Sequence, residues 1–322
     1  MSSKLISLAM KKTILITGGF GFLGGRLGQY LSENYNVILG SRSDRNEPDW
    51  LPTAKILKID WDDEISLSDA CNMVDIIIHA SGLNAQECSD DPEKALLVNG
   101  VYTQNLVEAA INQGVEKFIY LSTAHVYSDS LLGVITEDTP TTNTHPYATS
   151  HVAGENAVLL AIKQGSLDGS VVRIFNAFGS PVSKDVNCWM LLVNDLCRQA
   201  VVEKSLTLHG DSGTVRDFVT IDDFCSTIEF LIEDKSAGGN IVNIGSGESY
   251  TVGDMANRIQ KNCLDVLKFE LPVVFKQKLS IKKKSLDFQT NYLDDAGFKF
   301  ANDFDVEIKK LIYFCKENFY VE

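Results

Sequence analysis

A run of closely spaced glycines constrains the fold of this chain more than any other feature. The β-branched run Thr13–Thr17 before it predicts a strand, and Phe22–Leu31, at its end, predicts a helix. Glycines three residues apart let the chain turn tightly, let the backbone approach a pyrophosphate and let the helix pack closely on the strand. The helix N-terminus adds free N–H groups and a partial positive charge. We therefore expect a dinucleotide to bind at Gly18, Gly21, Phe22, Leu23 and Gly24.

Short apolar runs alternate with longer amphipathic ones, which indicates βα units around a parallel sheet covered by helices. The predicted strands are Thr13–Thr17, Asn36–Leu39, Lys55–Ile59, Val74–His79, Lys117–Leu121, Ser170–Ile174 and Asn240–Ile244. The predicted helices are Phe22–Leu31, Pro92–Gln113, Tyr147–Lys163, Asn187–Ala200, Asp222–Ile232 and Val252–Lys261. The regular alternation ends after residue 174, so the second region is expected to cap the first.

The charge balance argues against nucleic acid and membrane as partners. The chain has 29 basic and 43 acidic residues, a formal net charge of −14, and such a surface repels DNA, RNA and anionic lipid. No apolar stretch approaches the roughly 18 residues of a membrane span, and Leu5–Met10 is too short for a signal-peptide core. We expect a cytoplasmic protein. The basic segment 265–290 is interpreted as a solvated edge in preference to a phosphate-binding patch.

The cysteines and histidines lack the spacing of a metal site. Seven cysteines are scattered without a C-x-x-C pair, and His145 and His151 lie six residues apart. A structural zinc site or a disulfide framework needs closer, paired spacing. We expect neither.

The glycine segment Thr17–Gly24, read as T-G-G-x-G-F-L-G, resembles the fingerprint of the extended short-chain dehydrogenase/reductase family. This family includes nucleotide-sugar epimerases, dehydratases and ketoreductases. Other family markers follow in order from about residue 12 to 250: Asp60-Trp61, the turn His79–Gly82 and Asn99. The resemblance implies cofactor contacts by Asp60, Trp61, Ala80, Ser81, Gly82, Asn99 and Ser122.

The end of the second predicted strand distinguishes NAD from NADP. An acidic residue there would bind the ribose hydroxyls of NAD, whereas an arginine accommodates the 2′-phosphate of NADP. The chain has Ser41 and Arg42 at this point and no carboxylate before Asp44. Both side chains can donate to a phosphate. NADP(H) is therefore favoured, and NAD(H), with Arg42 solvated, remains the alternative.

Two further segments resemble the catalytic motifs of the family. Thr123 occupies the position of the catalytic Ser/Thr, and Tyr147 with His151 resembles the Y-x-x-x-K motif. Tyr147 and His151 are four residues apart, on one helix face. The resemblance implies that Tyr147 exchanges a proton with the substrate, that Thr123 bonds the same oxygen and that both Tyr147 and His151 contact the cofactor.

Histidine stands where the family has lysine. A phenol with a pKa of about 10 needs a nearby cation to act as a base, and histidine is only partly charged at pH 7. Either His151 substitutes for the lysine, or the protein binds cofactor without efficient turnover. We favour an active enzyme, because Thr123 and Tyr147 are both present.

His125 is a further catalytic candidate. The family's dehydratases carry an Asp-Glu pair where this chain has Ala124 and His125, which argues against a dehydratase. In other family members the second position carries a catalytic cysteine. His125 either takes that acid–base role or is a polar residue lining the pocket.

The resemblance also implies substrate contacts. The segments around Asn176 and Arg216 resemble those that contact the diphosphate of a nucleotide sugar, and a guanidinium fork suits two phosphates. The alternative for Arg216 is an ion pair with Asp217. The residues expected on the substrate side are Asn84, Thr123, Asn176, Asn187, Trp189 and Arg216.

Together these observations predict an α/β protein with a Rossmann-type doubly wound parallel sheet and a smaller C-terminal cap. Residues 1–174 plus 221–246 are expected to bind NAD(P), and residues 175–220 plus 247–322 the substrate. The leading function is a 4-keto reductase acting on a nucleoside-diphosphate sugar, because a weak cation at His151 favours proton donation. A nucleotide-sugar 4-epimerase is the alternative, and a weakly active or non-catalytic cofactor-binding protein the second. The resemblance further implies a homodimer formed through the two long helices.

Overall fold

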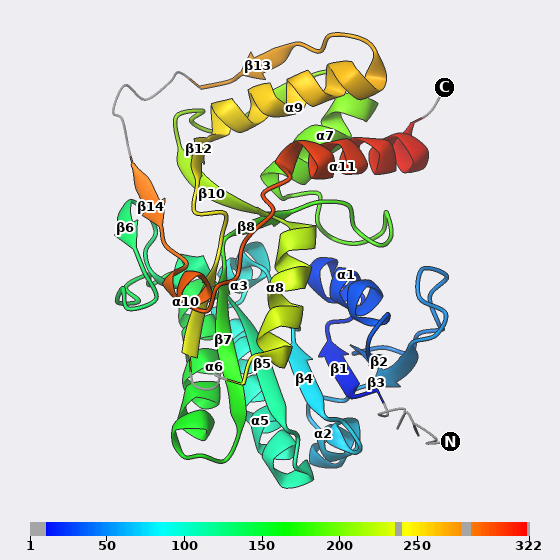
Figure 1. Ribbon diagram of the computed structural model, residues 1–322, viewed down its shortest axis with the longest axis vertical. Coiled ribbons are helices and arrows are strands. Elements are labelled where there is room, and N and C mark those ends of the chain that lie inside the picture. The colour runs from blue at the N-terminus through cyan, green and yellow to red at the C-terminus, as the bar shows by residue number, and fades with distance from the viewer. Residues whose placement is uncertain (1–10, 236–239, 278–284, 321–322) are drawn as a thin grey trace, which may run out of the picture.

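A parallel sheet forms the centre of the computed structural model, which describes residues 11–235, 240–277 and 285–320. Its seven strands follow the order β11-β7-β5-β4-β1-β2-β3 (Figure 1). They are β1 (Thr13–Thr17), β2 (Asn36–Ser41), β3 (Lys55–Lys58), β4 (Ile76–His79), β5 (Lys117–Thr123), β7 (Asp168–Ile174) and β11 (Asn240–Ile244). The order reverses at β1, so a ligand crevice is expected at the carboxyl ends of β1 and β4. The predicted Rossmann-type α/β fold is confirmed.

Helices cover both faces of the sheet, because both faces are apolar. Ile14 and Ile16 belong to the core under α1 (Phe22–Leu31) and α8 (Ile221–Glu233), whereas Leu15 belongs to the core on the opposite face. That opposite face is covered by α2 (Glu64–Cys71), α5 (Tyr102–Gln113) and α6 (Pro146–Lys163) (Figure 1). Side chains on a strand alternate between faces, so neighbouring residues of β1 enter different cores.

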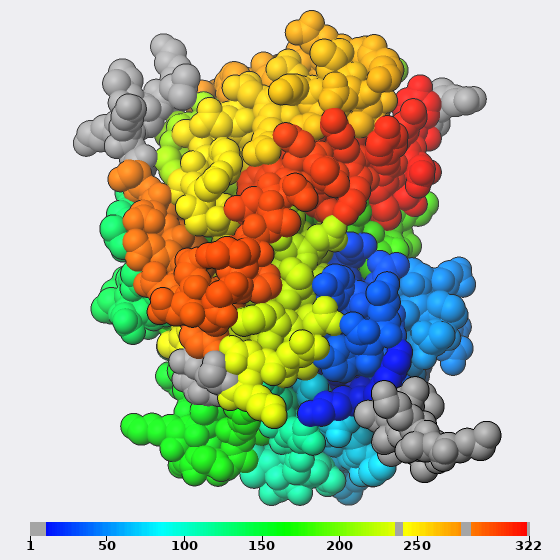
Figure 2. All heavy atoms as spheres, in the orientation of Figure 1, coloured from blue at the N-terminus to red at the C-terminus, as the bar shows by residue number. Residues whose placement is uncertain are grey.

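The C-terminal helices form a separate core above the carboxyl ends of the strands. Leu196, Met255 and Ile308 bury their side chains there, and Figure 2 shows the yellow to red segments covering this end of the molecule. The helices are α7 (Leu192–Val202), α9 (Val252–Leu267) and α11 (Phe304–Phe319). Short strands surround them or lie beside the sheet: β6 (Gly133–Ile135), β8 (Asn176–Phe178), β9 (Leu206–Leu208), β10 (Val215–Thr220), β12 (Ser249–Thr251), β13 (Val273–Phe275) and β14 (Leu286–Phe288).

The long helix predicted over Pro92–Gln113 is not regular. It runs as α4 (Pro92–Ala95), a π-helical segment η1 (Leu96–Val101) and α5. At η1 the chain lies close to α6, since a Cβ on Gly100 would be 3.0 Å from the Cβ of Ala153. A single wide turn inside an α-helix is frequent at functional sites. The remaining short helices are α3 (Ala85–Asp90), η2 (Ala124–Val126) and α10 (Asn291–Asp295).

Two other predicted helices differ from the structure by several residues at one end. The helix expected over Asn187–Ala200 begins only at Leu192, because residues 183–191 form successive turns closed by backbone hydrogen bonds. The helix expected over Val252–Lys261 continues to Leu267.

Residues 278–284 of the basic segment lie outside the described residues, while Lys276 is exposed. Among the residues that the structure describes, no helix is long and apolar enough to span a bilayer.

Candidate active site

The glycine turn has the geometry that a pyrophosphate requires. Gly18 adopts a left-handed conformation (φ +65°), and a Cβ on Gly24 would lie 2.3 Å from the carbonyl oxygen of Gly18. Only glycine fits at both positions. No side chain caps the N-terminus of α1, and its first turn holds no acidic residue. Its free N–H groups therefore fit the phosphates of a dinucleotide.

Buried hydrogen bonds join this turn to the loop after β4. His79 Nε2 lies 3.0 Å from the hydroxyl of Thr103, which donates its own proton to a backbone carbonyl, so His79 Nε2 carries the proton. His79 Nδ1 then accepts from Thr17 at 2.7 Å, and Thr17 accepts from the backbone N–H of Ser81. Burial lowers the pKa of His79 to about 3, so the ring is neutral. Thr17 and His79 belong to the two motifs described above, whereas no motif in the sequence singled out Thr103.

Asn99 lies one layer behind the expected cofactor contacts. Its side chain accepts from the backbone N–H of Leu83 at 2.8 Å and donates to Ser150 at 3.0 Å. A Cβ on Gly82 would be 3.1 Å from its oxygen. Asn99 therefore shapes the loop that carries Ala80, Ser81 and Gly82, and its own amide is occupied.

The expected adenosine contacts gather near the ends of β2 and β3. Arg42 and Asp60 are exposed and Ser41 is partly buried, whereas Trp61 is buried and stacks on Tyr102. Asp44 is exposed and pairs with Lys58 at 2.9 Å.

Arg45 is a cation that the sequence did not single out. Its guanidinium lies 5.2 Å from the ring centre of Phe20, inside the glycine turn. This side chain therefore lies beside the pyrophosphate turn, and only the fold brings it there.

The two expected catalytic hydroxyls lie together. Thr123 ends β5, Tyr147 is the second residue of α6, and a hydrogen bond from Thr123 lowers the pKa of the Tyr147 phenol. Burial is the larger effect and raises that pKa overall. His145 caps α6 by accepting the backbone N–H of Tyr147 at 3.1 Å, and its Nε2 contacts Ser89 at 2.9 Å. His145 thus fixes the start of α6, while burial keeps Tyr147 a protonated phenol.

His151 is not the partial cation that the sequence suggested. Its ring meets that of Tyr147 edge to face, with centroids 4.7 Å apart, so the two side chains share one site. Burial lowers the pKa of His151 to about 4. Since desolvation disfavours the charged form of an imidazole, His151 is neutral at pH 7 and does not lower the pKa of Tyr147.

A buried ion pair supports this site from behind. Glu155, one turn after His151 on α6, binds Arg173 at 2.7 Å and accepts the hydroxyl proton of Ser122 at 2.6 Å. The hydroxyl proton of Ser122 is therefore not available for the expected contact with the cofactor. The pair instead fixes the end of β5, and with it Thr123.

His125 is exposed, beside the substrate side of the site. Its ring lies 6.2 Å from that of Phe175. Although part of the side chain is exposed, desolvation lowers its pKa, and the charges of Arg216 and His145 act in the same direction. The side chain is therefore neutral at pH 7, close to Arg216.

The alternative of an ion pair between Arg216 and Asp217 is wrong. The two residues alternate on β10, and the carboxyl of Asp217 is fully buried, where it accepts two hydrogen bonds from Ser246. Burial raises the pKa of Asp217 to about 7. No carboxylate of the described residues pairs with Arg216, which is partly buried, so its guanidinium is available to an anion.

The other expected substrate residues do not all point to one place. Asn176 donates to the backbone of Asp217 at 2.8 Å, and Asn84 caps α3 through the backbone N–H of Glu87. Asn187 is exposed. Trp189 donates to a backbone carbonyl at 2.9 Å and packs on two aromatic rings of α11.

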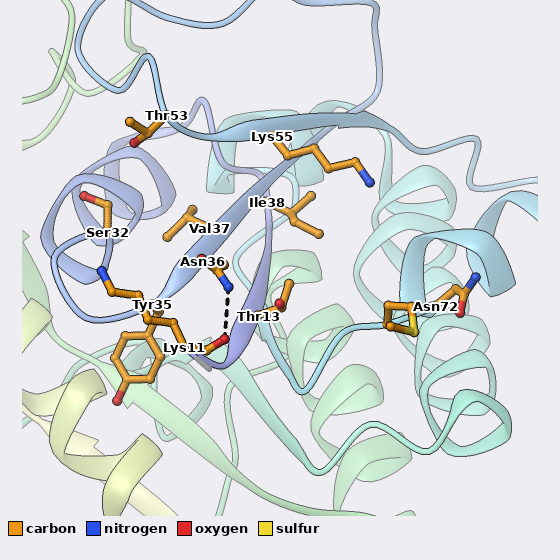
Figure 3. A pocket seen from close by; sticks show the side chains of 11 residues that line it. Lys11, Thr13, Ser32, Tyr35, Asn36, Val37, Ile38, Thr53, Lys55 and Asn72 are labelled. Carbon is orange, nitrogen blue, oxygen red and sulfur yellow. Dashed lines mark hydrogen bonds between the residues drawn. The ribbon is translucent and has the colours of Figure 1, made fainter. Parts of the chain in front are cut away.

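A surface cavity of about 500 Å³ lies elsewhere, at the opposite edge of the sheet. Figure 3 shows Thr13 and Asn36, at the amino ends of β1 and β2, among the residues that line it. The candidate site lies at the carboxyl ends, so the cavity is separate from it. The described residues contain no group of three or more side chains arranged to bind a metal.

Comparison with known families gives a match over most of the chain. A family model described as the NAD dependent epimerase/dehydratase family matches residues 14–245. A putative UDP-glucose 4-epimerase of Methanocaldococcus jannaschii is 25% identical over 320 residues, covering 95% of this chain and 99% of the relative.

Solved structures share the fold. The UDP-glucose 4-epimerase of Thermotoga maritima with UDP-glucose has a TM-score of 0.78 at 20% identity, with 95% of this chain and 99% of that one covered. RMD from Pseudomonas aeruginosa, complexed with NADPH, has a TM-score of 0.77 at 23% identity, with the same coverage.

Proposed function

The chain belongs to the NAD-dependent epimerase/dehydratase family, and from that membership we propose that it is a nucleotide-sugar 4-epimerase. The coarser assignment, an NAD(P)-dependent enzyme acting on nucleotide sugars, follows from the family. The names of the relatives favour the epimerase over the reductase that ranked first on the sequence alone. The observation that supports catalysis is the pair of hydroxyls of Thr123 and Tyr147 at the carboxyl end of β5.

Each residue of the site has a separate role in this proposal, which follows from its position. When bound, the nicotinamide exchanges a hydride with a ring carbon of the sugar. Tyr147 gives or takes the proton at its phenol oxygen, and Thr123 orients the same substrate oxygen. Arg216, unpaired within the described chain, binds the diphosphate through its fork of donors. We assign the substrate half to residues 175–220 plus 247–322, and the dinucleotide half to residues 1–174 plus 221–246.

A 4-keto reductase is the second candidate, because one observation favours it. His151 is neutral, and burial raises the pKa of Tyr147. Such a phenol donates a proton to a carbonyl readily, whereas it is a poor base for the oxidative half-reaction. A reductase needs only donation, but an epimerase needs both directions.

Two incubations separate the candidates. Purified protein is mixed with UDP-glucose without added dinucleotide, and the sugar is followed by NMR. A retained dinucleotide and the appearance of the C4 epimer support the epimerase. Cofactor-free protein that consumes NADPH only with a 4-keto sugar supports the reductase. If UDP-, dTDP-, GDP- and CDP-sugars are all neither bound nor converted, the proposed substrate class is wrong.

We further propose that NADP(H) binds more tightly than NAD(H), because Ser41 and Arg42 are close to the expected 2′-phosphate and Asp44 is paired with Lys58. Arg42→Ala should reduce the preference by about 1–3 kcal/mol, the contribution of a hydrogen bond to a charged group. Calorimetry with both dinucleotides measures this. Equal affinities in the wild type would contradict the proposal.

A homodimer is proposed as well. The helices expected at its interface carry large apolar side chains that are exposed in the single chain: Leu96, Leu97, Val101 and Leu160. An interface between two copies would bury these side chains.

A further inference from the structure

We propose that Tyr120 is a positioning residue that holds His151 as the Nε2–H tautomer, with that N–H directed at a ribose hydroxyl of the dinucleotide. The proposal rests on the proposed function in that it assumes a dinucleotide in this site. It explains how a chain with histidine in place of the lysine keeps a hydrogen-bond donor at that position.

The hydrogen-bond geometry distinguishes the two tautomers. The Tyr120 hydroxyl lies 3.0 Å from His151 Nδ1 and 3.4 Å from the carbonyl oxygen of Asn99. A phenol has one proton. If that proton went to Asn99, Nδ1 would have to donate to the phenol, and Nε2 would present a lone pair.

Two distances favour the other arrangement. The contact with His151 is the shorter, and the carbonyl of Asn99 already accepts from Thr103 at 2.8 Å. Hydrogen bonds weaken as the donor–acceptor distance grows beyond about 3.2 Å. The Tyr120 proton is therefore assigned to His151 Nδ1, which leaves the remaining proton on Nε2.

The atoms around the Tyr120 hydroxyl leave space for it only because residue 154 is a glycine. A Cβ on Gly154 would lie 2.6 Å from the Tyr120 oxygen and 2.5 Å from the carbonyl oxygen of Asn99. Any other residue at this position of α6 would displace one of them. The π-helical segment η1 places Asn99 here, so a glycine and a widened turn from two helices leave room for one phenol.

Neither Tyr120 nor His151 changes its protonation state over the working pH range. Tyr120 is 1% exposed, and burial raises the pKa of its phenol. His151 is 8% exposed, and the same effect lowers the pKa of its imidazole to about 4. Neither group ionises near pH 7, so the pair acts as a fixed donor–acceptor contact.

The free edge of the imidazole faces the cofactor side. A Cβ on Gly82, in the turn expected under the pyrophosphate, would be 3.8 Å from His151 Cε1. Tyr147 lies against the same ring at 4.7 Å. Cε1 lies between the two ring nitrogens, and Nδ1 points to Tyr120, so Nε2 lies beyond Cε1, on the side of the ring away from Tyr120.

The tautomer can be read directly by NMR of protein labelled with ¹⁵N-histidine, without cofactor. The wild type should show His151 as Nε2–H from pH 6 to 8. Tyr120→Phe should convert His151 to a mixture of tautomers or to Nδ1–H. Tyr127→Phe is the control, since it removes an equally buried hydroxyl that bonds Asn243 and leaves His151 untouched. His151 as Nδ1–H in the wild type, or an unchanged tautomer in Tyr120→Phe, would overturn the proposal.

Dinucleotide affinity supplies a second readout. Tyr120→Phe should weaken binding roughly fivefold to tenfold, the effect of one lost hydrogen bond. In a His151→Lys background the same change should alter affinity less than twofold, because an ammonium needs no tautomer to be selected. Equal losses in both backgrounds would assign Tyr120 a structural role only. If the wild type binds no dinucleotide, the proposed function fails, while the NMR result still decides the state of His151.

Discussion

At the scale of single residues, the charge of His151 in the structure differs from the partial positive charge that the sequence motif suggested. The resemblance to the family's motifs predicted the roles of Thr123, Tyr147 and His151, and the structure brings all three to one place. The ionisation of His151 was not predictable, because it depends on burial by segments distant in the sequence. Tyr120 escaped notice for the same reason, since its contact with His151 joins β5 to α6.

His151→Lys tests the consequence of that missing charge. In the wild type the oxidative half-reaction needs a tyrosinate, and burial raises the pKa of Tyr147, so its rate should rise with pH into the alkaline range. A lysine ammonium beside the phenol would lower that pKa, and each unit gives about a tenfold faster oxidation at a fixed lower pH. Single-turnover kinetics from pH 6 to 10 measure this. Superimposable pH profiles would show that charge at residue 151 is unimportant.

At the scale of elements, local patterns predicted the sheet better than the helices around the site. All seven predicted strands lie in the parallel sheet, since apolar β-branched runs specify a buried strand by themselves. The π-helical turn was not predictable, because it arises from the packing of η1 on α6. Helix α11 was missed, although Phe304, Ile308 and Leu311 carry a readable helical spacing.

The glycine turn gives a prediction at this scale. In Gly24→Ala the new methyl would clash with the Gly18 carbonyl, which must move away from its turn. Overpacking of this kind costs about 1–3 kcal/mol, so dinucleotide affinity should fall roughly tenfold to a hundredfold. Gly210→Ala is the matched control, because a Cβ there meets no atom within 4 Å. Calorimetry showing the same affinity for both variants would count against a phosphate site at the turn.

At the scale of the whole molecule, α8 joins the sheet to the C-terminal region. The carboxylate of Asp223 accepts the backbone N–H groups of Ala301 and Asn302 at 2.8 and 3.0 Å, just before α11 begins. Asp222 binds Arg26 of α1 and Lys310 of α11. Figure 2 shows the red and orange segment lying against the yellow-green of α8 and the blue of α1. The two regions of the site are therefore held in one arrangement.

Two buried neutral histidines make stability sensitive to acid. The folded-state pKa values are about 3 for His79 and about 4 for His151, whereas the unfolded value is about 6.5. The unfolded chain binds protons first, so stability falls as pH drops from about 6.5 towards 4. Between pH 7 and pH 5 the free energy of unfolding of His151→Gln should fall by about 2 kcal/mol less than that of the wild type. Asp217, with its pKa raised to about 7, acts in the opposite direction but equally in both proteins.

Urea unfolding at the two pH values measures this difference. Equal losses in the wild type and in His151→Gln would mean that His151 is already charged, or solvated, in the folded protein.

The central claim is that Tyr147 transfers the proton while a hydride moves between nicotinamide and sugar. The most direct test is turnover of a nucleotide sugar by Tyr147→Phe, measured beside its dinucleotide affinity. The account predicts that conversion falls by at least about a hundredfold, the lower range of general acid–base catalysis, while dinucleotide affinity stays within about threefold of the wild type. Full activity in Tyr147→Phe would contradict the account and make His125 the first candidate for the proton donor.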